Sequence, residues 1–395
     1  MLGGSANMDI NELVKGFRRL FPDDIDIRGY MAPGRVNLIG EHIDYNGGHV
    51  FPCALSVGNH AIVSDRKDKE IHFYSENFNK DGIIMANLDT LSYKKEDSWT
   101  NYAKGVFKAF LDHGYDIPHG FDIYIKGNIP GSGLSSSAAM EVLISTILND
   151  TFHFNISGKD IAIYSQEAEN KFCGLNCGIM DQFASANGKK DMALFLDCAS
   201  LNFDYVPLIL TGYKIIVTNS NKPHSLVSSH YNDRRRECEE ALSDLQKNLN
   251  IKYLCELSPE EFVEHAYLIK DETNLMRARF AIQEEDRTKK AVIALKENDL
   301  VTFGKLINES GDGLRYDYDA TCKEIDILVD EARKQKGCLG SRETGGGWGG
   351  NTISIVKDAY IDSFIANVGR TYQQITGLKA DFNILEIGDG GRRIL

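Results

Sequence analysis

A strand that runs through a glycine- and serine-rich turn into a helix lies between residues 121 and 147. Phe121–Lys126 alternates apolar and polar residues, which predicts a half-buried strand. Gly131 and Gly133 then permit a tight turn, and Ser135-Ser136-Ser137 opens a segment with apolar residues at helical spacing. The orphan N–H groups and partial positive charge at such a helix start favour an anion, most often a phosphate. A turn with serine caps that binds nothing is the alternative, and this segment alone does not separate the two.

A second glycine cluster, Gly345–Gly350, follows Arg342-Glu343-Thr344 and includes Trp348. Ordering so many glycines costs chain entropy, and a tight turn needs only one or two of them. The surplus indicates backbone that lies against a ligand or against another segment. In either case we expect this cluster to lie beside the first glycine loop.

A short polar stretch between Gly34 and Gly48 combines a cation, carboxylates and an imidazole. It contains Arg35, Glu41, His42 and Asp44. Sugar hydroxyl groups need such a mixed set, because carboxylates accept hydrogen bonds and imidazole can either donate or accept. The alternative is that Glu41 and His42 form an ordinary surface pair.

Asp181 lies in the apolar frame Cys177–Phe183. A buried aspartate is costly unless it is paired or hydrogen-bonded. One interpretation is a general base beside Arg35, which would keep Asp181 ionised by lowering its pKa against the raising effect of burial. The other is a helix cap or a structural salt bridge.

Helices and strands mix along the chain without a regular alternation, which favours an α+β fold over a doubly wound sheet. The apolar pattern relaxes near residue 205 and a new apolar strand begins at Tyr213, so we expect one domain at 1–205 and a second at 206–395. The expected helices are 11–21, 100–111, 139–147, 160–171, 233–248 and 272–298, and the expected strands are 29–39, 60–64, 71–75, 121–126, 213–218 and 352–356. Two charged runs, Arg234–Glu240 and Glu284–Lys290, are expected to be solvated helix faces.

Charge and cysteine content narrow the function classes. The net charge of −13 argues against a broad nucleic-acid surface, although it does not exclude a small anionic ligand held locally. The eight cysteines form no paired framework, so we expect reduced thiols and a cytoplasmic location. No apolar stretch of about 18 residues and no signal peptide occur, and we expect no membrane association and no obligate protein partner.

Together these motifs resemble the GHMP small-molecule kinases and, within them, the galactokinase family. Gly34–Gly48 is similar to the galactokinase signature, Pro130–Ala139 to the GHMP phosphate loop and Thr344–Gly350 to the third GHMP motif. The stretches 98–102, 177–183 and 229–236 also match galactokinase patterns. The resemblance implies an N-terminal mixed-sheet domain like domain 2 of ribosomal protein S5 and a C-terminal ferredoxin-like α+β domain. The active site would lie in the cleft between them.

The resemblance also implies ATP-dependent phosphorylation of the C1 hydroxyl of D-galactose, the first committed step of galactose catabolism by the Leloir pathway. By position, Asp181 matches the catalytic base, or a residue that only orients the hydroxyl, and Arg35 matches its partner near the transferring phosphoryl. The positions that match sugar-binding residues are Glu41, His42, Asp44, Gly178 and Tyr231. Those that match the ATP site are Ser75, Trp99, Gly131, Ser132, Gly133, Leu134, Ser135, Ser136 and Ser137. Ser137 and Glu169 match the Mg²⁺ positions, directly or through water.

Two other functions stay open on sequence alone. One is a kinase for N-acetylgalactosamine or another hexose, and the other is a non-catalytic regulator that senses galactose and ATP. The intact serine loop together with Arg35 and Asp181 favours an enzyme. Ile43 and Trp348 depart from the family pattern, where threonine and phenylalanine are usual.

Overall fold

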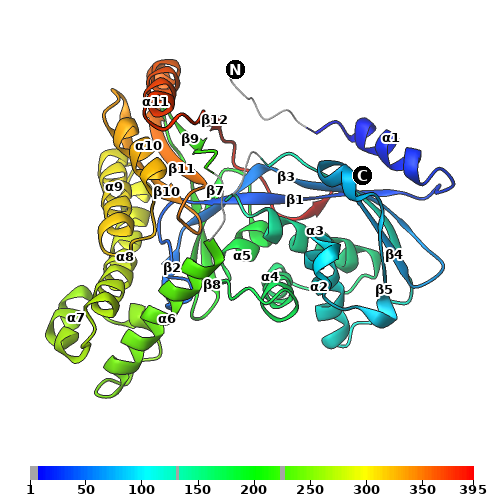
Figure 1. The fold of residues 1–395 in the computed structure, drawn as a ribbon, viewed down its shortest axis with the longest axis horizontal. Helices are drawn as coiled ribbons and strands as arrows, with labels where there is room; N and C mark the ends of the chain where they lie inside the picture. Colours follow the sequence, from blue (N-terminus) through cyan, green and yellow to red (C-terminus); the bar gives the residue numbers. More distant parts are fainter. Residues whose placement is uncertain (1–7, 130–132, 223–226) are drawn as a thin grey trace.

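Two β-sheets, each covered by helices, form the body of the protein in a computed structural model that describes residues 8–129, 133–222 and 227–395 (Figure 1). The larger sheet has six strands in the order β13-β1-β3-β6-β4-β5, the second has the order β10-β11-β9-β12, and a small third sheet has the order β2-β7-β8. This mixture of helices with largely antiparallel strands confirms the predicted α+β class.

The strands are β1 (Arg28–Asn37), β2 (His49–Val50), β3 (Pro52–Asp65), β4 (Glu70–Ser75), β5 (Ile84–Asn87), β6 (Phe121–Gly127), β7 (Met192–Asp197), β8 (Asn202–Pro207), β9 (Tyr213–Asn219), β10 (Cys338–Thr344), β11 (Asn351–Lys357), β12 (Asp381–Ile384) and β13 (Arg392–Arg393). The α-helices are α1 (Ile10–Leu20), α2 (Thr100–Asp112), α3 (Ser136–Thr151), α4 (Gly158–Glu167), α5 (Met180–Asn187), α6 (Val227–Gln246), α7 (Pro259–His265), α8 (Glu272–Lys296), α9 (Leu300–Tyr316), α10 (Lys323–Arg333) and α11 (Ile361–Thr376). A π-helical turn, Ala168–Phe172, continues α4.

Helices cover both faces of the six-stranded sheet. On one face, Ile123 of β6 packs with Phe107 of α2 and Ile144 of α3. On the other face, α1 lies across the sheet, and its Phe17 packs on Tyr124 of β6 (Figure 1). The prediction that β6 has one solvated face is therefore wrong, because a separate N-terminal helix covers the side that looks polar in sequence.

Strand β3 is much longer than the five residues expected from its apolar run. It extends back to Pro52 and pairs with β1 along its length, with a register shift between Pro33 and Arg35. Gly58 lies so close to β1 that a Cβ atom there would be 2.1 Å from the carbonyl oxygen of Ala32. Glycine and proline, which ordinarily interrupt strands, are accommodated here by the irregular pairing.

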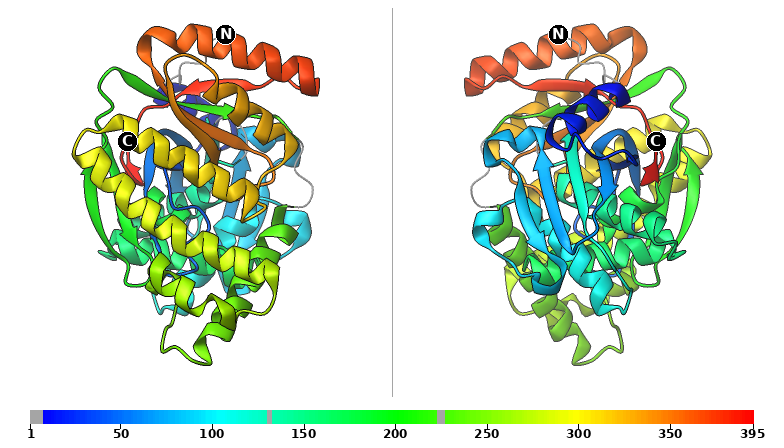
Figure 2. Two further views of the ribbon diagram at one scale, coloured as in Figure 1. Left: turned by 90° about the vertical axis from the view of Figure 1, so that its left-hand side faces the viewer. Right: turned by 90° about the vertical axis from the view of Figure 1, so that its right-hand side faces the viewer.

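The second sheet buries alternate residues of its central strand on opposite sides. Ile215 and Val217 of β9 pack toward α8 and α9, whereas Ile216 packs toward α10 and α11. Figure 2 shows the long α8 and α9 lying across one side of the molecule, with α11 above them. This two-sided burial explains why β9 reads as a continuous apolar run.

The C-terminal segment returns to the first sheet. The N–H of Gly388 donates to the Ala54 carbonyl at 2.9 Å, and the N–H of Gly390 donates to the Gly188 carbonyl at 2.8 Å. Strand β13 then pairs with β1, and covers the edge of the six-stranded sheet. The last residues of the chain thus lie among elements of its N-terminal half (Figure 1).

One fully buried arginine ties the two sheets together. Arg342 on β10 donates to the carbonyl of Asn37 at 2.8 Å and to that of Leu38 at 3.0 Å, where β1 ends. The polar stretch that follows β1 is therefore held against the end of β10. Within the described residues, no helix has both the length and the apolar character that crossing a membrane requires.

Candidate active site

A bidentate ion pair joins Arg35 on β1 to Asp181 in the first turn of α5. Nε of Arg35 lies 2.6 Å from Oδ1 of Asp181, and Nη2 lies 2.6 Å from Oδ2. The arginine side chain is 4% exposed, whereas that of the aspartate is 31% exposed. The guanidinium is thus fixed inside the protein while the carboxylate stays accessible, in contrast to the buried aspartate expected from its apolar neighbours.

The first glycine loop packs directly on this pair. The N–H of Arg35 donates to the Leu134 carbonyl at 3.2 Å, and its Nη1 donates to the Gly133 carbonyl at 3.2 Å. Ser135, with a left-handed backbone (φ 58°), donates its hydroxyl to Asp181. Burial lowers the pKa of Arg35, but the charge and hydrogen bonds of Asp181 outweigh it, and the net shift is upward. Arg35 is therefore a fixed positive charge at this place.

The glycine clusters lie against each other, as the sequence suggested. A Cβ atom on Gly345 would be 3.0 Å from the Gly133 carbonyl oxygen, and one on Gly133 would be 3.0 Å from Nδ2 of Asn351. Leu134 is buried, whereas Ser136 at the start of α3 is exposed. Gly131 and Ser132, also assigned to the phosphate loop, lie outside the described residues.

Glu41 and His42 are buried rather than exposed as a surface pair. Oε1 of Glu41 accepts hydrogen bonds from the Gly345 N–H at 2.9 Å and from Nη2 of Arg342 at 3.1 Å. Nδ1 of His42 is hydrogen-bonded to the Tyr45 hydroxyl at 2.9 Å. Burial, followed by the charge of Arg234, lowers the pKa of His42 to about 3, so the imidazole is neutral at physiological pH.

Asp44 and Gly178 are in close contact. A Cβ atom at Gly178 would lie 1.7 Å from Oδ2 of Asp44, so only glycine allows this approach. Burial, with a smaller contribution from the charge of Asp181, raises the pKa of Asp44 to about 6. Tyr231 lies nearby, with its ring centroid 5.4 Å from that of His42. All five residues assigned to the sugar are thus grouped beside the Arg35–Asp181 pair.

A cavity of about 360 Å³ lies at the start of α3. Ser136 and Ser137 line it together with Ser75 and with the aromatic side chains of Phe78 and Trp99. The ring of Phe78 stacks on that of Trp99 with centroids 6.0 Å apart and an interplanar angle of 16°. An apolar, aromatic pocket next to a helix N-terminus suits a nucleotide base with its phosphates.

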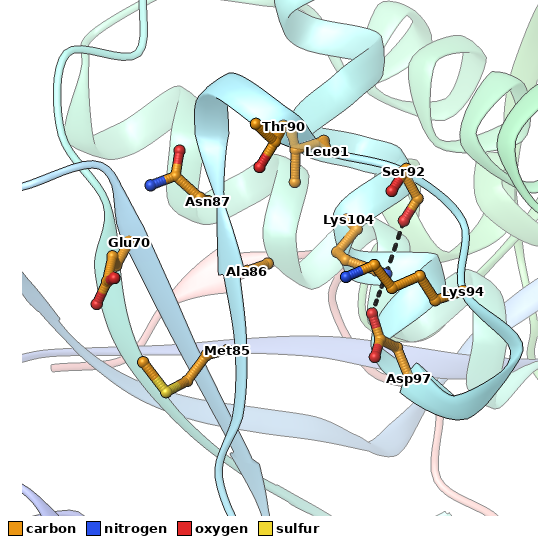
Figure 3. A pocket seen from close by; sticks show the side chains of 10 residues that line it. All are labelled: Glu70, Met85, Ala86, Asn87, Thr90, Leu91, Ser92, Lys94, Asp97 and Lys104. Atoms are coloured by element: carbon orange, nitrogen blue, oxygen red, sulfur yellow. Dashed lines mark hydrogen bonds and ion pairs between the residues drawn. The ribbon is translucent and has the colours of Figure 1, made fainter.

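A buried lysine fixes the turn that precedes Trp99. Nζ of Lys104 on α2 donates to the Ser92 carbonyl at 2.9 Å and to Oδ2 of Asp97 at 2.5 Å, in a second cavity drawn in Figure 3. Lys104 is 2% exposed, so this anchoring is internal to the fold. It holds the backbone from which the Trp99 side chain enters the first cavity.

Glu169 lies behind the serine loop in an acidic group of side chains. Burial, followed by the charge of Asp181, raises its pKa to about 7, while a hydrogen bond with Ser137 lowers it. Glu141 on α3 is fully buried next to it, and burial together with the charge of Glu169 raises the pKa of Glu141 well above its usual range. Three acidic side chains, counting Asp181, thus influence one another near Ser137.

No cluster of three or more His, Cys, Asp or Glu side chains in the described ranges is arranged as a complete metal site. Magnesium commonly takes only one or two protein ligands and fills its coordination sphere with phosphate oxygens and water. The pair Ser137 and Glu169 matches that mode of binding.

Some residues of the site gave no sequence signal. Glu141 lies in an expected helix and looked like an ordinary helix residue, Gln182 lies in the stretch 177–183 but was given no role, and Phe78 lies outside every motif. Two charged runs also differ from expectation: Arg234 is 7% exposed and bonds Glu237 and Asp319. Glu284 is fully buried and accepts a hydrogen bond from the Gly40 N–H at 2.9 Å. The prediction that both runs are wholly solvated is therefore wrong, because each supplies a carboxylate or guanidinium to an interior contact.

Three family profiles match the sequence: the galactokinase galactose-binding signature at residues 15–65, the GHMP kinases N terminal domain at 101–189 and the GHMP kinases C terminal at 291–374. A galactokinase of Fusobacterium nucleatum is 50% identical over 98% of this chain and 100% of its own. A galactokinase of Bacillus subtilis is 48% identical over 98% of this chain and 99% of its own.

Solved structures give the same result. The galactokinase of Lactococcus lactis, crystallised with galactose, superposes with a TM-score of 0.96 at 42% identity, covering 98% of this chain and 100% of that one. The mevalonate kinase of Methanococcus jannaschii has a TM-score of 0.66 at 16% identity, covering 93% of this chain and 99% of that one, and so shares the fold.

Proposed function

This chain belongs to the galactokinases of the GHMP kinase family, and from that membership we propose that it transfers the terminal phosphoryl group of ATP to the C1 hydroxyl group of D-galactose. The family fold has an N-terminal and a C-terminal domain, and we propose that the active site lies between them. The observation that carries the proposal is the accessible Asp181 carboxylate, fixed by Arg35 beside the glycine loop. Phosphoryl transfer asks a protein mainly for positioning and for stabilisation of charge, which this arrangement can supply.

We assign the proton-accepting role to Asp181. The C1 oxygen of galactose forms a bond to the terminal phosphorus of ATP, the bond from that phosphorus to the bridging oxygen breaks, and ADP leaves. The hydroxyl proton passes to the Asp181 carboxylate, whose two oxygens are held by Arg35. The fixed charge of Arg35 also stabilises the negative charge of the transferring group.

The other residues of the site are assigned to the sugar, to ATP or to Mg²⁺. Asp44, Glu41, His42, Gly178 and Tyr231 are the residues that we propose hold the sugar. For ATP, we propose that the loop 131–137 wraps the phosphates and that Ser75 and Trp99, which line the same cavity as Ser136 and Ser137, contact the nucleotide. Bound Mg²⁺ would neutralise part of the phosphate charge, and Ser137 and Glu169 are the residues that would hold it, directly or through water.

We also propose a domain division near residue 205 and a cytoplasmic location. β8 ends at Pro207 and β9, the central strand of the second sheet, begins at Tyr213, so the proposed division into 1–205 and 206–395 falls within a few residues of the connection between the two strands. The C-terminal segment crosses that division, because Gly388 and Gly390 bond to the first domain and β13 pairs with β1. The eight cysteines, all within the described ranges, are free thiols, as a reducing compartment favours.

A sugar panel tests the proposed function. At saturating Mg²⁺ and ATP, we expect kcat/KM to be highest for galactose and at least about tenfold lower for N-acetylgalactosamine, glucose and arabinose, since each changes a group that the site must match. ADP release measured against each sugar gives these values. A preference for N-acetylgalactosamine would change the substrate assignment, and no turnover of any sugar would favour a regulator.

The binding of galactose should depend on pH through Asp44. A carboxylate accepts sugar hydrogen bonds better than a carboxylic acid, and with a pKa of about 6 Asp44 is protonated below that pH and ionised above it. Affinity should therefore rise as pH rises, and we expect about tenfold tighter binding at pH 7 than at pH 5. Calorimetry without nucleotide measures this directly.

The pH series needs a matched variant. Asp44→Asn should bind galactose weakly and with no rise in affinity between pH 5 and pH 7. Asp112→Asn, a surface change at a side chain 58% exposed, should keep the wild-type slope. An unchanged slope in Asp44→Asn would refute the assignment of this titration to Asp44.

A further inference from the structure

We propose that Gln182 is a positioning residue for the metal site, which fixes the carboxylate of Glu169 through its side-chain amide with Glu141 as the second anchor. This inference rests on the proposed function, because it concerns the Mg²⁺ that Ser137 and Glu169 would hold. It adds to that function a residue that touches neither substrate nor metal.

The amide of Gln182 serves two carboxyl groups at once. Its Nε2 donates to Oε2 of Glu169 at 2.6 Å and to Oε2 of Glu141 at 3.0 Å. An amide nitrogen carries two hydrogens, so each bond can have a hydrogen of its own. Gln182 and Glu141 are both fully buried, so bulk solvent does not reach these contacts.

Three elements meet at this one side chain. Glu141 lies on α3, the helix that begins at the serine loop, and Gln182 lies in the first turn of α5. Glu169 lies in the π-helical turn Ala168–Phe172, a wide turn of a kind that is frequent at functional sites. The amide therefore links the π-turn to both helices that border the phosphate site.

Several neighbours orient the carboxyl group of Glu169. Gln182 and the Cys177 thiol, at 3.6 Å, both donate to Oε2. Ser137 and Glu141 also form side-chain hydrogen bonds with this carboxyl group. Gln182 is therefore part of the set of contacts that fixes how Glu169 faces the proposed cation. Residues that orient a metal ligand in this way typically change metal affinity about 10- to 100-fold when they are mutated.

The same helical turn carries the proposed base. Asp181 and Gln182 are adjacent, and their side chains diverge, one to Arg35 and the other to Glu169. The position of the metal carboxylate relative to the base is therefore fixed through two consecutive residues on α5. A flexible connection would allow that separation to vary, at a cost in alignment of the phosphoryl group.

The substitution Gln182→Glu tests the inference, because it keeps the volume of the side chain but removes both donors. With the non-hydrolysable ATP analogue AMPPNP present, Mn²⁺ titration followed by electron paramagnetic resonance gives the metal affinity without catalysis. We expect the dissociation constant for Mn²⁺ to rise at least about tenfold. The affinity for AMPPNP without metal should change by less than about threefold, which a general loss of structure would not allow. Gln246→Glu, an exposed position where the amide bonds only the Ile251 carbonyl, should behave as wild type.

Activity supplies an independent reading of the same variant. For Gln182→Glu, the Mg²⁺ concentration at half-maximal rate should rise, and high Mg²⁺ should restore most of kcat. Wild-type Mn²⁺ affinity in a folded Gln182→Glu protein would overturn the inference.

Should Gln182→Glu fail to fold, the variant Glu141→Leu tests the inference instead. It keeps Gln182 but removes one of the two acceptors of its amide, so Mn²⁺ affinity should still fall, and an unchanged affinity would overturn the inference. Wild-type protein that binds no Mn²⁺ would overturn the metal site and this inference together. If that wild-type protein nevertheless phosphorylates galactose, the proposed function stands. A failure of this inference can therefore be told apart from a failure of the proposed function.

Discussion

Replacement of Asp181 by asparagine should reduce kcat for galactose by about 10²- to 10⁴-fold, the usual contribution of a positioned general base. Asparagine has the size of aspartate but cannot take up a proton from the C1 hydroxyl. It also leaves Arg35, whose side chain is 4% exposed, without its counter-charge. Steady-state rates at saturating ATP and galactose measure the loss.

Binding measurements separate this loss from a folding defect. The affinities of Asp181→Asn for ATP and galactose should stay within about tenfold of wild type, because other residues hold both substrates. Asp112→Asn, at an exposed ion pair with Lys108, is the matched change and should leave kcat unaltered. A near-normal kcat in Asp181→Asn would show that this carboxylate is structural.

The second large effect is expected from Arg35→Lys, which keeps the positive charge but loses the planar guanidinium group. Lysine cannot form the two parallel bonds of 2.6 Å to Asp181 and also reach the Gly133 carbonyl. We expect kcat to fall by about 10²- to 10³-fold, because the charge no longer lies where the transferring group becomes negative. The rate at saturating substrates is again the measurement.

A double variant tests whether the two residues act as a unit. If they do, Arg35→Lys combined with Asp181→Asn should lose little more than Asp181→Asn alone. Arg236→Lys, at a side chain 63% exposed, is the control that shows what replacing arginine by lysine does away from the site. If the fold-loss of kcat in the double variant instead equals the product of the two single losses, the two residues act independently, which would contradict a shared role.

Residues grouped in one short motif were the easiest to place from sequence. Arg35, Glu41, His42 and Asp44 lie within ten positions of one another, and the structure brings them together. The two glycine clusters are more than 200 residues apart, yet their composition indicated close packing, and Gly133 does lie against Gly345. In both cases the signal is local, since unusual residue types in a short span have few structural explanations.

Contacts that depend on distant elements gave no such signal. Gln182 follows Asp181 in the stretch 177–183, but nothing in that stretch gives the glutamine a partner, and only the folded chain brings it to Glu141, 41 positions away. Arg234 belongs to a charged run that reads as a solvated helix face, but Asp319 lies opposite it, 85 positions away. Tyr124 looked solvent-facing because nothing in β6 shows that α1 covers it. Periodicity describes one element at a time and cannot show which element packs on it.

Pairing of β13 with β1 has a consequence for the way the protein is made on the ribosome. β1 ends at Asn37, but the partner that covers its edge contains Arg392 and Arg393, more than 350 positions later. A nascent chain would therefore expose an unpaired strand edge on β1 until β13 has been synthesised, a state that invites aggregation. Binding of a chaperone to the edge of β1 during synthesis would protect the chain until β13 pairs with it.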